Sequence, residues 1–261
     1  MNSPIPKKSL GQHWLHDAAS LQAMCHAAAI GADDTVLEIG PGLGTLTEFL
    51  VEQAKQVVAV EFDHELAVGL PGRVPAANLS VTESDILRFD FGTLPPDYKI
   101  VANIPYYLTS NLVRVISETP NRPAKVALLV QKEVAERIAA EPGQMSLLSV
   151  SAQFYWKVQL HELVPAALFT PPPKVDSQIV SLARRGNPLY PDANEKQFFR
   201  IVKAGFSQKR KTLLNSLSGG LALSKDDTRT LLGAAKISPN ARAQTLSLDD
   251  WHRLYLQVVA P

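Results

Sequence analysis

Asn103, Ile104, Pro105 and Tyr106 follow an apolar run, residues 99–102, and offer the groups needed to hold a planar amino compound. The Asn103 side-chain oxygen and the Ile104 carbonyl can each accept a hydrogen bond from an exocyclic amino group. Pro105 fixes its own φ and pushes Ile104 into an extended conformation, which aims that carbonyl. Tyr106 has a flat face for an extruded base. An amino nitrogen held in this way presents its lone pair to an electrophile. The structural alternative is a strand that ends in a proline turn with packed tyrosines.

A second motif is a glycine-rich turn between an expected strand, residues 35–39, and an expected helix, residues 45–50. Its glycines, Gly40, Gly42 and Gly44, have the spacing G-x-G-x-G. Such a turn lets a ligand approach the backbone closely and presents the N–H groups of a helix N-terminus. The dinucleotide fingerprint has the different spacing G-x-G-x-x-G, so the turn argues against an NAD oxidoreductase.

Acidic residues end the next two expected strands. Glu61 follows residues 57–60 and can accept both hydroxyls of a ribose, while Asp85 follows residues 79–82 and can read an adenine amino group. Asn103 ends the fourth strand. Ligands bind at the carboxyl edge of a doubly wound parallel sheet, so this order predicts an α/β domain that binds a nucleoside.

Five segments resemble the ribosomal RNA adenine N6-dimethyltransferase family, and the resemblance runs from about residue 7 to residue 250. These segments are residues 7–15, 36–44, 131–137, 169–177 and 206–213. The pattern Phe-x-Pro-x-Pro-Lys-Val-Asp-Ser at residues 169–177 is highly specific. Residues 103–106 match the Asn/Asp-x-Pro-Tyr/Phe signature of enzymes that methylate an adenine amino group. The resemblance implies an α/β, Rossmann-like sheet that uses S-adenosylmethionine, with a small C-terminal helical domain.

The resemblance also implies roles for individual residues. Around the target base it places Asn103, Ile104, Pro105, Tyr106 and Phe169. Around S-adenosylmethionine it places His13, Leu15, Gly40, Glu61, Asp85 and Asn103, and it implies no metal. No general base is needed, because the methylated nitrogen is cationic and loses its proton to water. Catalysis would then rest on positioning and electrostatics.

Some residues depart from the family pattern. Trp14 stands where Phe is usual, Ile104 where Leu is usual, and Tyr107 where Asn is common. None of these changes alters the expected chemistry. Residues 141–149 form a shorter segment than the family's usual loop, which puts any RNA contact by that loop in doubt.

The remaining patterns predict two domains. A strand at residues 124–130 and an antiparallel pair at residues 154–160 and 177–182 would complete the sheet, and residues 184–188 read as a linker. Helices are expected at residues 196–206, 211–217 and 225–235 and after residue 247. We therefore expect a catalytic domain with an N-terminal arm over residues 1–185, and a helical RNA-docking domain over residues 186–261.

Charge is distributed unevenly between these two parts. The net charge is only +1, but residues 1–185 hold 15 Lys/Arg and 19 Asp/Glu, whereas residues 186–261 hold 11 and 6. A basic domain beside a near-neutral one is typical of RNA recognition. The run Lys209, Arg210 and Lys211 is a candidate phosphate contact, and a solvated helix face is the alternative.

Composition limits the cellular setting. One cysteine, Cys25, leaves no intramolecular disulfide and fits a reducing compartment. The sequence has no apolar run of transmembrane length and no targeting peptide, and its six histidines form no metal-binding set. We expect a monomeric, cytoplasmic protein without a membrane partner.

Three functions remain open. The first, implied by resemblance to the bacterial small-subunit branch, is N6-dimethylation of two adjacent adenosines near the 3′ end of 16S rRNA, which contributes to ribosome biogenesis. The second is methylation of large-subunit rRNA adenine, as in antibiotic resistance. The third is an assembly factor whose binding to the small-subunit precursor outweighs its catalysis.

Overall fold

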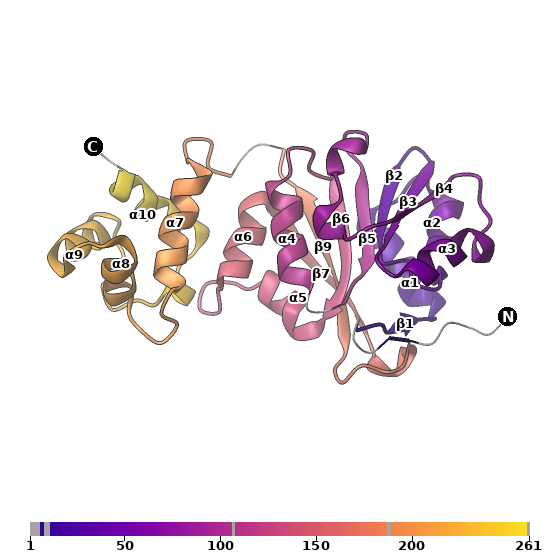
Figure 1. The fold of residues 1–261 in the computed structure, drawn as a ribbon. Coiled ribbons are helices and arrows are strands. Elements are labelled where there is room, and N and C mark those ends of the chain that lie inside the picture. Colours follow the sequence, from indigo (N-terminus) through magenta and orange to yellow (C-terminus); the bar gives the residue numbers. More distant parts are fainter. Residues whose placement is uncertain (1–5, 8–10, 106–107, 187–188, 260–261) are drawn as a thin grey trace. The chain divides into compact units, whose positions relative to one another are not determined.

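The computed structural model describes residues 6–7, 11–105, 108–186 and 189–259 (Figure 1). The chain forms two compact units. The first comprises residues 1–136 and 156–184, and the second comprises residues 137–155 and 185–261.

A seven-stranded sheet, counted over the described residues, forms the centre of the first unit. Its strand order is β4-β3-β2-β5-β6-β9-β7, with the first five strands parallel and β9 antiparallel to both of its neighbours. Central strands covered on both faces need continuous apolar sequence, as in Val126 to Val130. The strands are β2 (Thr35–Ile39), β3 (Gln56–Glu61), β4 (Leu79–Glu83), β5 (Lys99–Asn103), β6 (Lys125–Gln131), β7 (Trp156–Val164) and β9 (Ser177–Arg184).

Five α-helices precede, connect or follow the parallel strands among the described residues (Figure 1). Two of them begin at an aspartate cap: the Asp17 carboxylate accepts from the Ser20 N–H at 2.8 Å, and Asp63 accepts from the Glu65 N–H at 3.1 Å. These caps satisfy N–H groups that lack a partner in the first turn. The helices are α1 (Ala18–Ala28), α2 (Thr45–Gln53), α3 (His64–Arg73), α4 (Thr109–Glu118) and α5 (Lys132–Ile138).

The N-terminal arm is held at two places. Its short strand β1 (Trp14–Leu15) pairs antiparallel with β8 (Phe169–Thr170), so that Leu15 lies opposite Phe169. Before this strand, the Lys7 ammonium contacts the Asp63 carboxylate at 2.7 Å. The arm is therefore tied both to the N-terminus of α3 and to a segment more than 150 residues away in sequence.

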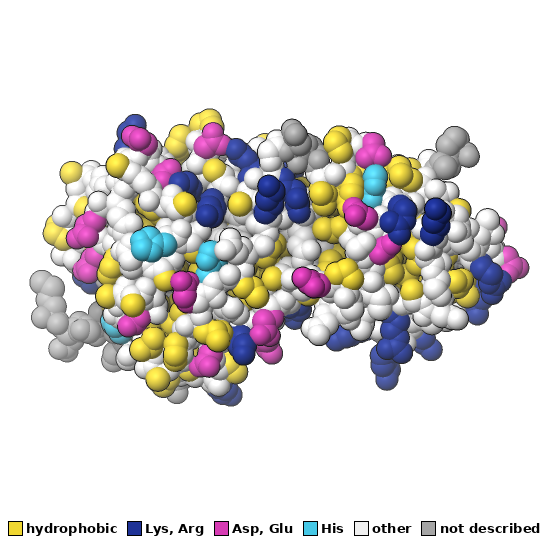
Figure 2. Space-filling view, turned by 180° about the vertical axis from the view of Figure 1, so that it is seen from behind, with side chains coloured by type: hydrophobic (Ala, Val, Ile, Leu, Met, Phe, Trp, Pro, Cys, Tyr) yellow, Lys and Arg dark blue, Asp and Glu magenta, His cyan; other side chains and the backbone are white. Residues whose placement is uncertain are grey.

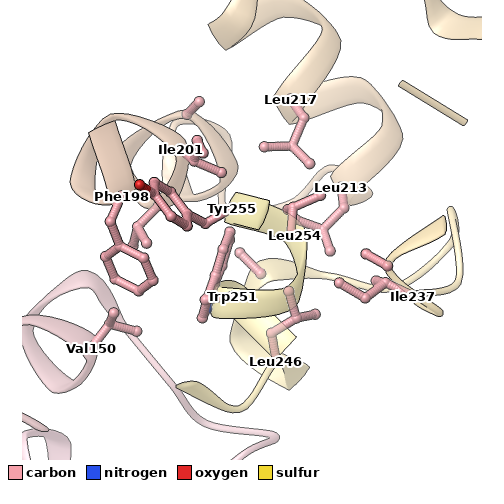
Figure 3. Close-up of a cluster of buried hydrophobic side chains, with 14 of the residues drawn as sticks. Val150, Phe198, Ile201, Leu213, Leu217, Ile237, Leu246, Trp251, Leu254 and Tyr255 are labelled. Atoms are coloured by element: carbon pink, nitrogen blue, oxygen red, sulfur yellow. The ribbon is translucent and has the colours of Figure 1, made fainter. Parts of the chain in front are cut away.

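The second unit is helical and has its own apolar core (Figure 3). Trp251 is completely buried at its centre, among Leu213, Leu217 and Leu254. The helices are α6 (Leu147–Tyr155), α7 (Glu195–Phe206), α8 (Leu213–Leu221), α9 (Lys225–Ala234) and α10 (Leu248–Val259).

Residues 137–155 lie in this second unit, whereas the division expected at residue 185 assigned them to the first. The reason is the apolar face of α6, from which Val150 points toward Phe198 in Figure 3. Phe154 lies on the same core, with its ring centroid 4.8 Å from that of Phe198. Because α6 continues to Tyr155, strand β7 begins two residues later than expected.

Candidate active site

A cavity of about 250 Å³ lies in the first unit, at the carboxyl ends of the parallel strands and against the arm. The ends of β2, β3 and β5, the loop after β4 and arm residues 11–15 all contribute to its wall. All six residues predicted around the cofactor line it, and so does Pro105, which was predicted only near the base. They are His13, Leu15, Gly40, Glu61, Asp85, Asn103 and Pro105.

The glycine turn adopts the left-handed backbone that its composition predicts. Gly40 has φ +68° and forms the cavity wall just after β2. Gly44, with φ +93°, precedes α2, and a Cβ atom there would lie 2.7 Å from Val74 Cγ2. The turn is held from behind by Arg73, whose guanidinium donates to the carbonyls of Gly42 and Leu43 at 3.1 Å each. Its carbonyls are thus fixed before any ligand binds.

Glu61 ends β3 and is 6% exposed. Its Oε2 accepts from the Gly42 N–H at 3.1 Å, and its Oε1 accepts from the Asp63 N–H at 2.9 Å. Burial raises the pKa of Glu61, and these backbone hydrogen bonds oppose that rise. Each carboxylate oxygen can accept a second hydrogen bond, so the group retains one site per oxygen for a diol.

The arm sets the orientation of Asn103. The Asn103 Nδ2 group donates to the His13 carbonyl at 3.3 Å, and a carbonyl can only accept. This contact places the side-chain oxygen of Asn103 on the other side of the amide. The arm is fixed in turn, because His13 Nδ1 donates to the Pro171 carbonyl at 2.7 Å and Thr45 Oγ1 donates to the Leu15 carbonyl at 2.9 Å.

Asp85 lies in the loop after β4. It caps the short helix η2 (Ile86–Arg88), where its Oδ1 accepts from the Leu87 N–H at 3.0 Å. The carboxylate is therefore fixed in the cavity wall beside Ile86. This position is compatible with the expected contact to an adenine amino group, which stays a prediction.

Two described residues that were predicted around the base, Ile104 and Phe169, do not line the cavity. The Ile104 side chain is buried, at 2% exposure, and its predicted contribution is its carbonyl. Phe169 is 3% exposed and packs in a core cluster with Leu15 and Leu21. Tyr106 lies outside the described residues. Stacking of a base between Phe169 and Tyr106 stays a prediction.

The cavity also contains polar groups that the motifs did not predict. Glu38, one residue before the end of β2, is 1% exposed, and neither of its carboxylate oxygens has a hydrogen-bond partner among the described residues. The indole N–H of Trp14 lacks a described partner as well. A charged residue inside the apolar run Val36 to Ile39 was the available signal for Glu38. Orphaned buried polar atoms around a cavity favour a ligand with charged and hydrogen-bonding groups.

Two kinds of feature are absent from the described part of the chain. Residues 6–7, 11–105, 108–186 and 189–259 contain no group of three or more His, Cys, Asp or Glu side chains that could hold a metal ion. Within the same ranges, no helix is both long and apolar enough to cross a membrane.

The family model and the sequence relatives that match this chain all concern ribosomal RNA methylation. A family model described as ribosomal RNA adenine dimethylase matches residues 6–259. The chain is 42% identical over 258 residues to a ribosomal RNA small subunit methyltransferase A of Dehalococcoides mccartyi, which covers 96% of this chain and 87% of the relative. It is 38% identical over 261 residues to the protein of the same name from Moorella thermoacetica, covering 95% and 90%.

Solved structures show the same fold. A dimethyladenosine transferase from Plasmodium falciparum superimposes with a TM-score of 0.77 at 28% identity, covering 92% of this chain and 95% of that one. The 23S rRNA methyltransferase ErmE superimposes with a TM-score of 0.74 at 27% identity, covering 94% and 98%. The sheet is thus a Rossmann-like methyltransferase fold, as the sequence predicted.

Proposed function

Because the chain belongs to the ribosomal RNA adenine dimethylase family, we propose that it transfers methyl groups from S-adenosylmethionine to the N6 atoms of two adjacent adenosines near the 3′ end of 16S rRNA. One observation carries this proposal. The residues predicted for the cofactor and Asn103, the acceptor predicted for the amino group, line the same cavity. The sequence relatives named for the small subunit support 16S rRNA as the substrate.

The groups in the cavity wall support S-adenosylmethionine as the cofactor. Glu61 keeps one acceptor site on each carboxylate oxygen for a ribose diol, and Asp85 also lines the cavity. The orphaned Glu38 carboxylate suits a cationic ligand. When bound, the cofactor supplies an electrophilic methyl group on its sulfonium sulfur.

The protein's part in the reaction is to hold the amino group. We assign its two hydrogens to the Asn103 side-chain oxygen and the Ile104 carbonyl. The contact from Asn103 Nδ2 to the His13 carbonyl supports this assignment, because it leaves the side-chain oxygen for the substrate. With both hydrogens held, the nitrogen lone pair faces the donor. Positioning of this kind replaces a general base.

We assign RNA docking to the second unit. It holds 13 Lys/Arg against 7 Asp/Glu, so it stays basic after residues 137–155 are included. Figure 2 shows Lys and Arg side chains projecting from its surface. The exposed run Lys209, Arg210 and Lys211 lies in the turn between α7 and α8, rather than on a helix face. We propose further that the protein is monomeric and cytoplasmic.

Methylation of large-subunit rRNA is the second candidate, and the fold shared with ErmE favours it. One experiment separates the two. Purified protein is given S-adenosylmethionine with a labelled methyl group, together with unmethylated small subunits, large subunits or naked RNA, and the modified nucleotides are mapped. We expect label on two adjacent adenosines of the small subunit. Label on the large subunit would replace the proposal with the second candidate. Binding to small-subunit precursors without label would instead identify an assembly factor.

A further inference from the structure

Glu38 is a buried acid that the proposed reaction does not use. It lies one residue before the end of β2, is 1% exposed, and forms part of the cavity wall. Neither oxygen of its carboxylate has a hydrogen-bond partner among the described residues, and neither does the buried hydroxyl of Thr47 on α2. An ionised carboxylate in such a place is strongly unfavourable unless a cation accompanies it.

The described residues around Glu38 provide no such cation. The titratable groups that act on it are the Cys25 thiol of α1 and the Glu61 carboxylate at the end of β3. The neighbouring strands place Ala59 and Val101 beside it in register. Among the described residues, no salt bridge includes it.

The Glu38 carboxyl and the Cys25 thiol are both held in their neutral forms. Burial raises the pKa of Glu38 to about 8. The nearby Thr47 hydroxyl opposes this rise without meeting hydrogen-bond geometry, and the Glu61 charge adds to it. Burial also raises the pKa of the Cys25 thiol to about 11, so that group is neutral at pH 7.

We propose that Glu38 carries a proton when the cavity is empty and releases it when a cationic methyl donor binds. The carboxylate then serves as the counter-charge for the donor. A positive charge within roughly 4–6 Å of a carboxylate favours its ionised form. We place the sulfonium beside Glu38, rather than the ammonium group that donor and product share, so that Glu38 selects the donor, S-adenosylmethionine, over S-adenosylhomocysteine, the product that has lost the sulfonium charge. This inference rests on the proposed function for the identity of the cofactor.

Linkage gives the direction of the pH effect. The Glu38 pKa lies near 8 in the empty protein and is lower in the complex, so the complex binds fewer protons. Affinity for S-adenosylmethionine should therefore rise with pH up to about 8 and then level off, by at most about tenfold per pH unit for one proton. The rise should be shallower for S-adenosylhomocysteine.

The experiment is titration calorimetry of both ligands with wild-type protein, Glu38→Gln and Glu48→Gln. Glu38→Gln keeps the size of the side chain and reproduces its uncharged form, so folding should survive. Glu48, ten residues further on in α2, is exposed and serves as the matched control. Titrations in buffers of different ionisation enthalpy count the protons released. The amino group of the ligand titrates near pH 7.7–8.0, so measurements run from about pH 6 to 7.5 and the variants are compared with one another.

We expect wild type and Glu48→Gln to release close to one proton more than Glu38→Gln on binding S-adenosylmethionine at pH 7. The donor-to-product affinity ratio should fall several-fold in Glu38→Gln. Equal proton release by wild type and Glu38→Gln would overturn the inference while leaving the proposed function in place. Equal release with both ligands would overturn the selection of donor over product. Failure of the wild-type protein to bind S-adenosylmethionine at any pH would instead overturn the proposed function.

Discussion

At the scale of single residues, the site depends on contacts that hold functional groups ready before a ligand arrives. The Asn103 amide is oriented by the arm, and the Glu61 carboxylate is oriented by two backbone N–H groups. The sequence located both residues through their positions at strand ends. It could not predict which arm carbonyl would orient Asn103, because that contact joins residues 90 positions apart.

Asn103→Ala should slow methyl transfer by about 10²–10³ while binding to the small subunit stays within a few-fold of wild type. The substitution removes the acceptor for the target amino group, and loss of one preorganised polar contact typically costs about 10²–10³ in rate. The assay uses saturating S-adenosylmethionine, since Asn103 also lines the cofactor cavity. Turnover near the wild-type rate would show that another residue holds the amino group.

Glu61→Ala should weaken S-adenosylmethionine binding by about 1.5–3 kcal/mol, because the ribose loses a charged acceptor. The alanine also releases the Gly42 and Asp63 N–H groups. Glu61→Gln is therefore the informative partner, since its one amide oxygen retains part of this network. Calorimetry should rank wild type above Glu61→Gln and Glu61→Ala last. Unchanged affinity in both variants would remove Glu61 from the site.

Glu38 also makes the stability of the free protein depend on pH. Its folded pKa is raised above the ordinary value of 4.5, so the folded state holds the proton more tightly than the unfolded state. The stabilisation that comes from this tightly held proton is fully present below about pH 4.5. As the pH rises from there to about 8, the free energy of unfolding falls by up to about 1.4 kcal/mol per pH unit. Denaturant unfolding should show wild type losing stability relative to Glu38→Gln across this range. Parallel curves for the two proteins would contradict the assignment.

At the scale of elements, the strands and the glycine turn were predictable because their signals are local. Val57 to Val60 reads as a strand and forms one, and Gly44 takes the positive φ that the turn requires. Two features were not predictable. The pairing of Leu15 with Phe169 joins distant segments, and α6 was misassigned because an apolar helix face does not show which core it will join.

Gly44→Ala tests the turn as an element. The new methyl group would lie within 2.7 Å of Val74 Cγ2 and would sit at φ +93°, so we expect a loss of about 1–3 kcal/mol in the free energy of unfolding. Gly72→Ala is the matched control. Gly72 lies in α3 with no atom within 4 Å of the position of an added Cβ, and this change should stabilise the protein by up to about 1 kcal/mol. Equal stabilities of the two variants would contradict this account of the turn.

At the scale of the whole molecule, the chain divides its charge between two compact units. The sequence predicted the basic C-terminal region from composition, which does not depend on the exact boundary. Replacing Lys209, Arg210 and Lys211 with Ala should lower RNA affinity. It should also flatten the salt dependence of binding by about 0.7–0.9 log units for each RNA phosphate that the variant no longer neutralises.

The control for this change replaces Lys55 and Lys157, two exposed lysines of the first unit. That variant should keep the wild-type salt slope, and both variants should bind S-adenosylmethionine normally. A triple variant with an unaltered slope would show that the run between α7 and α8 is only a solvated turn.

The pairing of β1 with β8 has a consequence for synthesis of the protein. Translation proceeds from the N-terminus, so the glycine turn, Glu61, Asp85 and Asn103 all leave the ribosome before Phe169 does. Strand β1 of the arm is among the first segments to be made. It cannot pair with β8 until Phe169 and Thr170 have left the ribosome. A nascent chain stalled short of residue 170 would hold every described residue that lines the cavity and would still lack the β1–β8 pairing that holds its arm. Cofactor binding should thus be one of the last events in the maturation of the first unit. It should occur only after nearly the whole of that unit has been translated.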